Sequence, residues 1–254
     1  PELSFDDLPI PAREHPAYRR YLYRFSNPKF REQPFTTMIA SRGCSFRCTY
    51  CVPTSSSFAR EMEAYRTGVA KPKAKAGSPA RVIAEFRDLA RLGFKSVMVL
   101  DDQFLWAKAR SLAICAGVAG LGIRWGCLSR ADFLTDGEVV EALARAGCVS
   151  IDIGVESLDQ RVLDSVNKDL KVEDVETAVG LLKRHGIRAK LNLMIGVSEV
   201  ETEESVRSTL KRVRALPVTE VMFSVATPFK GTPYYDRFKA QGYLIDDTDA
   251  IDPM

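Results

Sequence analysis

The sequence predicts an α/β protein of 254 residues in which six parallel strands form a partial (β/α)6 barrel. Short apolar runs rich in β-branched residues alternate with helical patterns along most of the chain. Such alternation favours a parallel sheet with right-handed crossover connections. A closed barrel of about 250 residues normally has eight units, but the long segment 41–78 leaves room for only six. The six runs span residues 36–40, 96–100, 123–128, 149–154, 189–195 and 221–226.

The helices between these runs are predicted from apolar residues spaced three and four apart, which is the period of a helix. One helix is expected to begin at Ser78 and Pro79, because serine caps a helix and proline suits its first position. Another is expected after the segment Thr135-Asp-Gly-Glu138, which has the spacing of a capping box with Thr135 as the cap. Each helix then returns the chain to the start of the next strand.

The composition excludes two broad classes of protein. Lys and Arg number 36 against 33 Asp and Glu, so the formal net charge is only +3, and no long block of one sign occurs. This balance excludes a polybasic nucleic-acid binder and an acidic disordered chain. No segment approaches the roughly 18 consecutive apolar residues of a membrane span. Six cysteines are too few for a disulfide scaffold of this length, which favours a reducing, cytoplasmic setting.

Three regions are predicted along the chain. Residues 1–33 contain several prolines and show no sustained period, which indicates an N-terminal arm or a connector from a preceding domain. Residues 34–240 form the core, and residues 241–254 form a C-terminal tail. Because the chain begins with a proline rather than Met, we expect it to be a piece of a longer protein. The lysine-rich stretch from Lys71 to Lys75 is expected to be a solvated loop.

Three cysteines, Cys44, Cys48 and Cys51, lie within eight residues directly after the first predicted strand, in the spacing CxxxCxxC. Three kinds of metal centre are compatible with a cysteine cluster. Structural zinc normally has four ligands in two paired elements, and an electron-transfer 4Fe–4S cluster has four cysteines. The sequence contains neither a second pair of Cys or His nor a fourth cysteine nearby. The third alternative is a cluster that three cysteines hold, with one iron open to a substrate or cofactor.

A CxxxCxxC loop after the first strand of a parallel α/β protein resembles the radical S-adenosylmethionine (SAM) superfamily. Residues 34–240 of this chain would correspond to the core of that family. In that family the open iron of a 4Fe–4S cluster binds the amino and carboxylate groups of SAM. Reduction of the cluster then cleaves SAM and yields a 5′-deoxyadenosyl radical. The resemblance therefore implies a radical SAM enzyme with a partial barrel, a small-molecule substrate and an external one-electron reductant of the flavodoxin or ferredoxin type.

The resemblance also implies which residues contact SAM near the first two strands. Barrel chemistry collects at the carboxyl ends of the strands, where polar residues follow the apolar runs here. Tyr50, just before the third cysteine, corresponds to the aromatic position whose backbone approaches the adenine. Asp101, Asp102 and Gln103 take the place of the family's Gly-Gly-Glu tripeptide, which holds the methionine amino group.

Two further strand ends receive roles from the same resemblance. Arg130 is expected to pair with the methionine carboxylate, because a guanidinium suits a carboxylate bidentately. Glu156 and Ser157 fall where the ribose hydroxyls are bound. After the fifth strand, the segment Gly196-Val-Ser-Glu-Val-Glu-Thr202 lacks the proline of the family's Gly-x-Pro-x-Glu-Thr pattern and has one extra residue. The resemblance assigns no catalytic residue beyond the cluster ligands.

Both ends of the chain resemble the cobalamin-dependent branch of the family. Residues 3–11 are similar to the connector after a cobalamin-binding domain, and residues 227–235 are similar to the branch's TPxxGTPxY segment. The branch implies methylation, cyclisation or rearrangement of an unactivated carbon in a biosynthetic intermediate. Cobalamin is then a possible further cofactor, bound by a neighbouring domain that this chain lacks, because no Asp-x-His-x-x-Gly ligand pattern occurs here.

Two alternatives remain open at this point. A methylthiotransferase-like RNA modifier would need a second cluster and an RNA-binding appendage, and the sequence shows neither, so nucleic acid is not the expected partner. A non-catalytic iron–sulfur or zinc scaffold would use the same cysteines. The other cysteines, Cys115, Cys127 and Cys148, are expected to be small buried hydrophobic residues.

Overall fold

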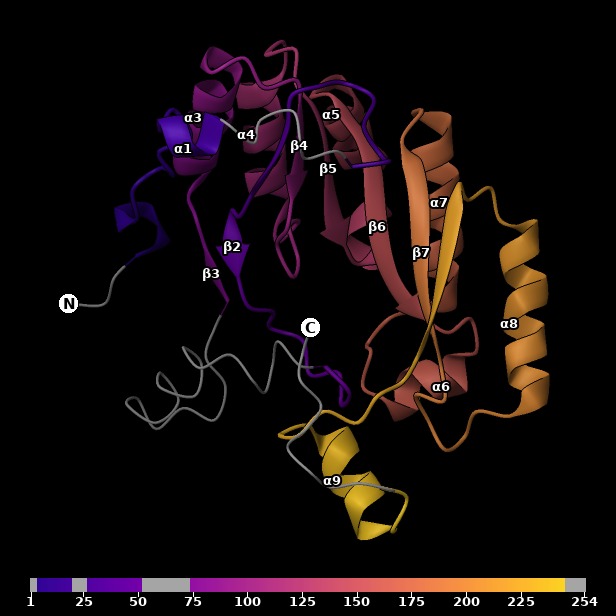
Figure 1. The fold of residues 1–254 in the computed structure, drawn as a ribbon. Coiled ribbons are helices and arrows are strands. Elements are labelled where there is room, and N and C mark those ends of the chain that lie inside the picture. The colour runs from indigo at the N-terminus through magenta and orange to yellow at the C-terminus, as the bar shows by residue number, and fades with distance from the viewer. Residues whose placement is uncertain (1–3, 20–26, 52–73, 245–254) are drawn as a thin grey trace.

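The computed structural model describes residues 4–19, 27–51 and 74–244 of the chain (Figure 1). Its centre is a six-stranded sheet with the strand order β1-β4-β5-β6-β7-β8, in which every neighbouring pair is parallel. The predicted fold class, a partial barrel with six strands, is therefore confirmed. The strands are β1 (Phe35–Met38), β4 (Ser96–Val99), β5 (Arg124–Ser129), β6 (Cys148–Glu156), β7 (Arg188–Ile195) and β8 (Glu220–Val225).

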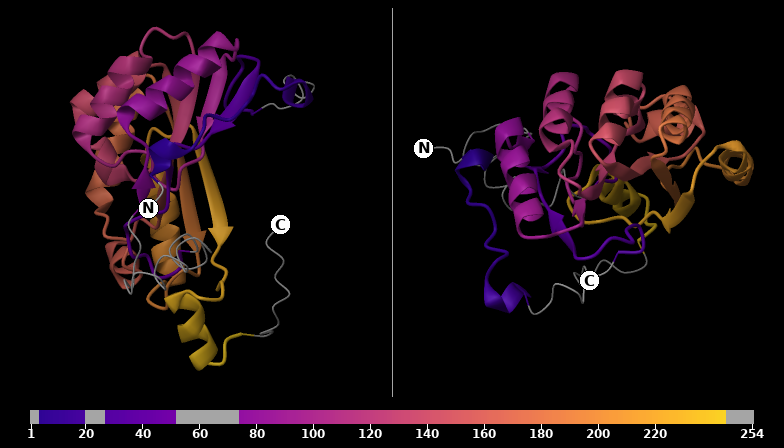
Figure 2. Two further views of the ribbon diagram at one scale, coloured as in Figure 1. Left: turned by 90° about the vertical axis from the view of Figure 1, so that its left-hand side faces the viewer. Right: turned by 90° about the horizontal axis from the view of Figure 1, so that it is seen from above.

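Long helices connect the strands and cover one face of the sheet, as the view from above shows (Figure 2). They are α3 (Pro79–Arg91), α4 (Lys108–Val118), α5 (Gly137–Arg145), α7 (Val172–Arg184) and α8 (Glu203–Ala215). Shorter elements complete the described chain: η1 (Phe5–Asp7), α1 (Pro16–Arg19), η3 (Ala131–Leu134), α6 (Gln160–Ser165) and α9 (Pro233–Ala240). Among these described helices, none has the length and apolarity that a membrane crossing requires.

Of the two helix caps predicted from local sequence, one is confirmed and one is wrong. Ser78 caps α3 by accepting a hydrogen bond from the Arg81 N–H at 3.2 Å, and Pro79 is the first helical residue, as predicted. The prediction that Thr135 caps α5 is wrong, because Asp136 is the cap and accepts from the Glu138 N–H at 2.9 Å. The preceding turn η3 leaves Thr135 in the helical region (φ −85°, ψ −10°), whereas a cap needs an extended backbone.

The main hydrophobic core lies between the helices and the sheet. Trp125 of β5 is fully buried there and meets Phe86 and Phe104 edge-on, with ring centroids 5.8 and 5.6 Å away. Its indole N–H donates to the Ala146 carbonyl at 2.8 Å, so that the buried polar atom is satisfied. Side chains alternate along β4, and Met98 accordingly belongs to a second, smaller cluster with Phe30 and Phe35. This second cluster therefore lies on the opposite face of the sheet.

The N-terminal arm packs on the edge of this fold beside α3 (Figure 1). Arg13 is buried, forms an ion pair with Glu85 of α3 at 2.8 Å and donates to the Thr37 carbonyl of β1 at 2.9 Å. The Tyr18 hydroxyl lies 2.6 Å from the Thr36 hydroxyl. These contacts tie the described part of the arm to the core. The predicted boundary between residues 33 and 34 stays a prediction.

The long segment after β1 begins and ends in a two-stranded ribbon that the sequence did not indicate. Strands β2 (Ser41–Arg42) and β3 (Lys75–Ala76) pair antiparallel. Lys75 is therefore exposed but part of a strand, which corrects the prediction of a loop at that residue. Lys71 and Lys73, the other lysines of the predicted loop, lie outside the described residues.

Candidate active site

The cysteine loop lies at the carboxyl edge of the sheet. In Figure 1 the strands β6 and β7 point downward toward the segment that contains Cys44, Cys48 and Cys51. Cys48 is buried, and the other two are half-buried. Gly43 adopts a left-handed backbone (φ +84°), and its N–H donates to the Asp102 carboxylate at 2.9 Å. The loop that follows β1 and β2 is thus tied to the end of β4, as expected for a site at the mouth of the barrel.

The chemistry of this loop fits a 4Fe–4S cluster better than a single ion. Among the described residues, no three His, Cys, Asp or Glu side chains are arranged to hold one metal ion. A four-iron cluster instead takes one thiolate per iron, so its cysteines need not converge on a point. The Thr49 hydroxyl, between the second and third cysteines, is buried and has no hydrogen-bond partner among the described residues. Burying such a donor is costly unless something bound beside it accepts its hydrogen bond.

The electrostatics of Cys44 also fit a negatively charged cluster. Burial raises the pKa of the Cys44 thiol, which disfavours the free thiolate, while Arg130 and Lys168 act in the opposite direction. Two cations facing a half-buried thiol stabilise negative charge at that position. The three cysteines therefore form a suitable donor set for the cluster, and the two cations offset part of its negative charge.

A buried ion pair lies next to the cysteine loop. The Lys168 ammonium donates to the Glu156 carboxylate at 2.8 Å and to the Tyr50 hydroxyl at 3.4 Å. Both charged side chains are about nine-tenths buried. Burial lowers the pKa of Lys168, but the negative charges of Glu156 and Cys48 outweigh it, and the net pKa is raised. Burial, followed by the charge of Glu156, raises the pKa of Tyr50.

The end of β6 is shaped to accommodate this pair. Glu156 has a left-handed backbone conformation (φ +69°), which is unusual for a residue with a side chain. A Cβ at Gly154 would lie 3.1 Å from the Glu156 carboxylate and 3.3 Å from the Lys168 ammonium. Glycine at that position therefore leaves the space in which the ion pair sits. Lys168 was not among the predicted site residues, because its burial beside Glu156 depends on the turn between α6 and α7 and leaves no local sequence signal.

Arg130 is held by several partners of its own chain. Its guanidinium donates to Asp132 at 3.0 Å, to the Lys168 carbonyl at 2.7 Å and to the Asp169 carbonyl. The guanidinium also lies 3.6 Å from the centre of the Phe46 ring, in the cysteine loop. The expected pairing of Arg130 with the methionine carboxylate stays a prediction, and it would require the exchange of one of these partners.

Asp101 connects the ends of β4 and β1. Its carboxylate accepts hydrogen bonds from the Ala40 N–H at 2.7 Å and from the Ser41 hydroxyl at 2.6 Å, and its side chain is buried. Burial raises the pKa of Asp101 to about 6, although both hydrogen bonds favour the charged form. The carboxylate is therefore close to the mouth but already bound to the neighbouring strand end.

Replacing Asp101 with Asn is expected to flatten the pH dependence of stability between about pH 4 and about pH 6. The folded chain binds this proton more tightly than the unfolded chain, whose pKa is near the ordinary 3.8. The free energy of unfolding therefore falls as the pH rises through this window, by about 3 kcal/mol. Urea unfolding of the apo chain across the window measures the slope. If the variant keeps the same slope, another group must cause the pH dependence of the free energy of unfolding. Glu173→Gln, at an exposed carboxylate, is the control.

The other residues predicted to contact SAM, which are Asp102, Gln103 and Ser157, differ in exposure and in hydrogen-bond partners. Asp102 is exposed beside Gly43, next to the first cysteine. Gln103 is buried, and its amide oxygen accepts from the Arg130 N–H at 2.9 Å, so it joins β4 to β5. The Ser157 hydroxyl is 3.5 Å from the Thr209 hydroxyl of α8. The structure thus places Tyr50 and Glu156 around the Lys168 ammonium, and Asp102 against Gly43 at the start of the cysteine loop. Gln103 and Ser157 instead contact neighbouring elements.

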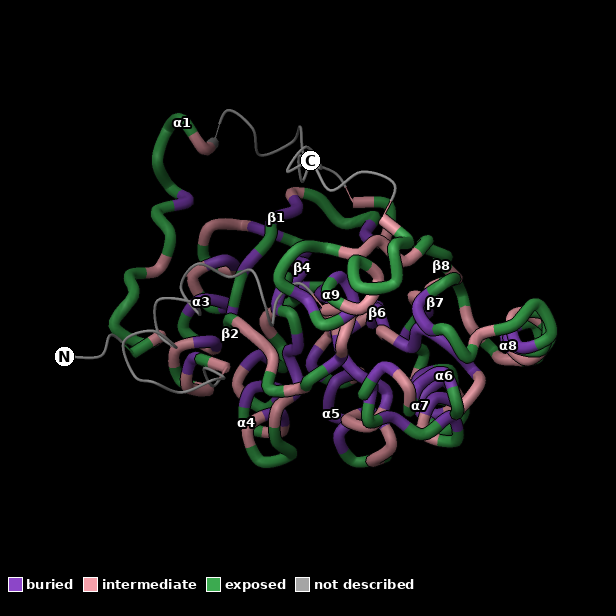
Figure 3. Tube along the Cα trace, turned by 90° about the horizontal axis from the view of Figure 1, so that it is seen from below, coloured by how far each residue is buried: buried purple, intermediate pink, exposed green. Residues whose placement is uncertain are grey.

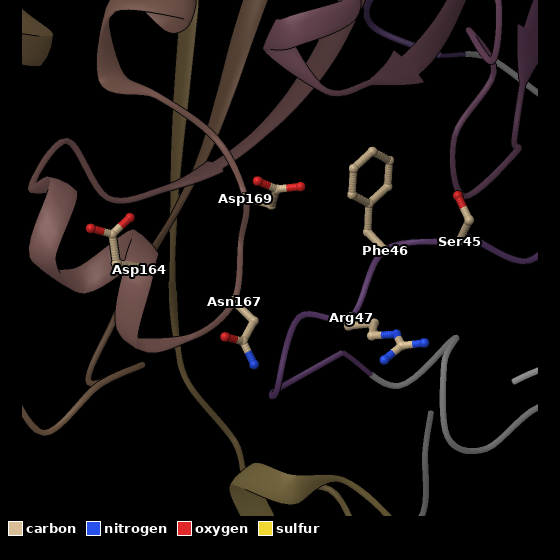
Figure 4. A pocket seen from close by; sticks show the side chains of 6 residues that line it. All are labelled: Ser45, Phe46, Arg47, Asp164, Asn167 and Asp169. Atoms are coloured by element: carbon tan, nitrogen blue, oxygen red, sulfur yellow. The ribbon is translucent and has the colours of Figure 1, made fainter. Parts of the chain in front are cut away.

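A cleft of ≈ 690 Å³ opens between the cysteine loop and the turn after α6 (Figure 4). Its lining residues come from the cysteine loop, from α6 and from the turn after α6, and are Ser45, Phe46, Arg47, Asp164, Asn167 and Asp169. The three cysteines outside the loop lie elsewhere, and all are buried. Burial raises the pKa of Cys115 to about 12, so this thiol stays protonated and is a poor metal ligand. The prediction that these three cysteines are buried is confirmed, and the role of the loop cysteines as ligands stays a prediction.

Comparison with known proteins establishes the family. Residues 38–213 match the radical SAM superfamily, which is more than half of the chain, and the chain belongs to that superfamily. The predicted family and enzyme class are therefore confirmed. A 4Fe–4S cluster and SAM are the cofactors of this class, and the non-catalytic scaffold is not favoured.

Several curated proteins are similar to the chain. An uncharacterized methyltransferase of Pyrococcus horikoshii is 29% identical over 245 residues, which cover 95% of this chain and 49% of that protein. The bacteriochlorophyllide d C-12(1)-methyltransferase of Chlorobaculum tepidum is 27% identical, covering 80% and 42%. The anaerobic magnesium-protoporphyrin IX monomethyl ester cyclase of Rubrivivax gelatinosus is 27% identical, covering 81% and 35%. The chain thus spans about half or less of the length of these relatives.

Solved structures agree with the fold. The radical SAM methyltransferase TsrM from Kitasatospora setae, solved with cobalamin and a 4Fe–4S cluster bound, superposes with a TM-score of 0.69. The two are 22% identical, and the match covers 85% of this chain and 38% of TsrM. At this identity the likeness shows that the two share the partial barrel.

Proposed function

We propose that this chain is the catalytic core of an enzyme that methylates, cyclises or rearranges an unactivated carbon of a small biosynthetic intermediate. The observation that carries the proposal is the position of three cysteines of one loop beside the buried Glu156–Lys168 pair at the mouth of the barrel. Similarity to methyltransferases and to a cyclase supports this range of reactions. When bound, the cluster supplies the electron that cleaves SAM to a 5′-deoxyadenosyl radical.

The residues of this chain bind and orient the cofactors in this proposal. Cys44, Cys48 and Cys51 hold the cluster. The Tyr50 backbone faces the adenine, and Glu156 accepts hydrogen bonds from the ribose hydroxyls. Charge-assisted hydrogen bonds of this kind are strong in a site that excludes water, which is why a carboxylate suits this role.

Three more assignments follow the same edge of the sheet. Asp102 binds the methionine amino group, with Asp101 and Gln103 fixing the strand ends on both sides of it. Arg130 or its neighbour Lys168 faces the methionine carboxylate, because both cations lie beside the cysteine loop. Ser157 is the weakest of the proposed ribose contacts, since its hydroxyl faces α8.

We also propose a longer protein in which a cobalamin-binding domain precedes this core. The support is the similarity of residues 3–11 and 227–235 to the cobalamin-dependent branch, together with the short coverage of the relatives. A flavodoxin- or ferredoxin-like protein would deliver the electron, in a cytoplasmic setting that keeps the thiols reduced. RNA modification is not favoured, because the described cysteines outside the loop are all buried in the hydrophobic core.

The decisive experiment is reductive cleavage of SAM. The chain is reconstituted anaerobically with iron and sulfide, mixed with SAM and dithionite, and assayed for 5′-deoxyadenosine. We expect release of 5′-deoxyadenosine without any substrate, because cleavage needs only the cluster, an electron and SAM. A fully loaded cluster that releases no 5′-deoxyadenosine would contradict the proposed function.

Titration with hydroxocobalamin tests the proposal of a longer protein. Tight binding of hydroxocobalamin by this chain alone would contradict a separate cobalamin-binding domain.

Replacing Glu156 with Gln is expected to weaken SAM binding about 10- to 100-fold, which corresponds to about 1.5–3 kcal/mol for a hydrogen bond to a charged group. Anaerobic calorimetry on the reconstituted chain measures the dissociation constant. Iron content should stay as in the unchanged chain. The exposed Glu203→Gln serves as the control, and unchanged affinity in Glu156→Gln would refute the ribose assignment.

A further inference from the structure

We propose that the first turn of α9 is part of the cluster site and that Tyr234 is a positioning residue for the segment Cys48–Cys51. The inference rests on the proposed role of the three cysteines. It concerns a region outside the part of the chain that matches the superfamily, which ends at residue 213. Figure 1 shows α9 below the carboxyl ends of the strands, and in the view from below (Figure 3) α9 lies at the centre, over the strands.

The argument begins at Thr49, between the second and third cysteines. Its N–H donates to the Val166 carbonyl at the end of α6, at 2.9 Å, and its carbonyl accepts from the Tyr234 N–H of α9, at 3.1 Å. Both backbone groups of one residue are thus bonded to elements far away in sequence. Because peptide groups are planar and rigid, two such bonds determine the position and the orientation of the chain there. They therefore position the backbone segment that carries Cys48 and Cys51.

The start of α9 is built so that it can donate this hydrogen bond. The first N–H groups of a helix have no partner within the helix. Pro233 occupies the first position and has no N–H, so Tyr234 carries the first available one. The Thr232 cap accepts from the Tyr235 N–H at 3.1 Å and leaves the Tyr234 N–H for Thr49. The positive end of the helix dipole then faces a loop that carries thiolates, which is a favourable arrangement.

The side chain of Tyr234 holds this turn against the barrel. It is fully buried, and its hydroxyl donates to the Gly196 carbonyl, just after β7, at 2.5 Å. Its ring packs on Phe238, with centroids 4.3 Å apart. Tyr234 consequently joins three parts of the molecule: the end of β7 through its hydroxyl, α9 through its ring, and the cysteine loop through its N–H. Loss of the hydroxyl would free α9, and with it the Thr49 carbonyl.

The test uses the full chain with Tyr234→Phe, which keeps the ring and removes only the bond to Gly196. Hydrogen exchange of the apo protein measures local opening of residues 44–51, and chelator challenge of the reconstituted protein measures the rate of iron loss. We expect both rates to rise about 2- to 10-fold, the factor that corresponds to one net hydrogen bond. Thr232→Ala, which removes the cap of α9, should have the same effects. The exposed Tyr243→Phe is the matched control.

The electron paramagnetic resonance spectrum of the reduced cluster supplies a readout that a purely structural role would not change. We expect Tyr234→Phe to alter this spectrum while exchange in β6 and β7 stays as in the unchanged chain. Unchanged exchange at 44–51, or exchange that rises equally throughout the sheet, would overturn the inference. If the unchanged chain binds no iron through the three cysteines, the proposed function fails, but the exchange of the apo protein still tests the contact between α9 and Thr49.

Discussion

Replacing Cys44, Cys48 or Cys51 with Ala is expected to abolish the brown iron–sulfur chromophore or to leave only a labile fragment. Each thiolate holds one iron of the cluster, and the described part of the chain offers no other cysteine near the loop. Removal of one ligand therefore leaves an iron without a protein donor. Iron and sulfide content after anaerobic reconstitution, together with the visible absorption spectrum, measures the loss.

Cys115→Ala is the matched control for this experiment. This thiol is buried within α4, and its pKa of about 12 keeps it protonated. The variant should retain as much iron as the unchanged chain. Equal loss of iron in Cys115→Ala and in the loop variants would show that the cysteines act through stability rather than as ligands, and the ligand assignment would be wrong.

Replacing Lys168 with Met is expected to lower the free energy of unfolding by about 3–5 kcal/mol, because it leaves the Glu156 carboxylate buried without its partner. The ammonium and the carboxylate are 2.8 Å apart, and both side chains are about nine-tenths buried. Urea unfolding of the apo chain near neutral pH measures the loss. The exposed pair Glu203–Arg207 supplies the control, since Arg207→Met should change stability by less than about 1 kcal/mol.

The double variant Glu156→Gln with Lys168→Met separates the charge effect from lost packing. With both charges removed, no uncompensated charge is buried, so we expect most of the stability to return. The two single changes would then be strongly non-additive. Additive losses would indicate that the two side chains do not act as a pair and would contradict the geometry at the end of β6.

Local sequence was a good guide to the elements and to the position of the site along the chain. The alternation of strands and helices can be predicted from the spacing of apolar residues, which is visible within short segments of the sequence. Likewise, the cap at Ser78 needs only two adjacent residues. The cap at Asp136 was missed because the turn η3 shifts the helix start by one residue, and that turn depends on packing rather than on the capping pattern.

The contacts of the site were less predictable. The pairing of Arg130 with the methionine carboxylate stays a prediction, but the sequence did not indicate that its guanidinium would contact Asp132 and two backbone carbonyls and stack on Phe46. Lys168 has no distinctive local pattern, yet the turn after α6 buries it beside Glu156. The position of a residue at the end of a strand predicts which edge of the sheet it occupies. The contacts of its side chain, however, depend on neighbours from other strands.

The residues alone predict the alternation that makes a parallel partial barrel and contain the three-cysteine loop that indicates the superfamily. Both are properties of residues close together in the chain. The packing of strands and helices, by contrast, selects which charges are buried at the mouth and how Thr49 is held between α6 and α9. Thr49 contacts Val166 and Tyr234, which lie 117 and 185 positions away in the chain, and the Glu156–Lys168 pair, 12 positions apart, depends on the turn after α6. Their partners are chosen when the sheet and the helices pack, because burial makes a hydrogen bond or a countercharge necessary for each polar group that leaves water.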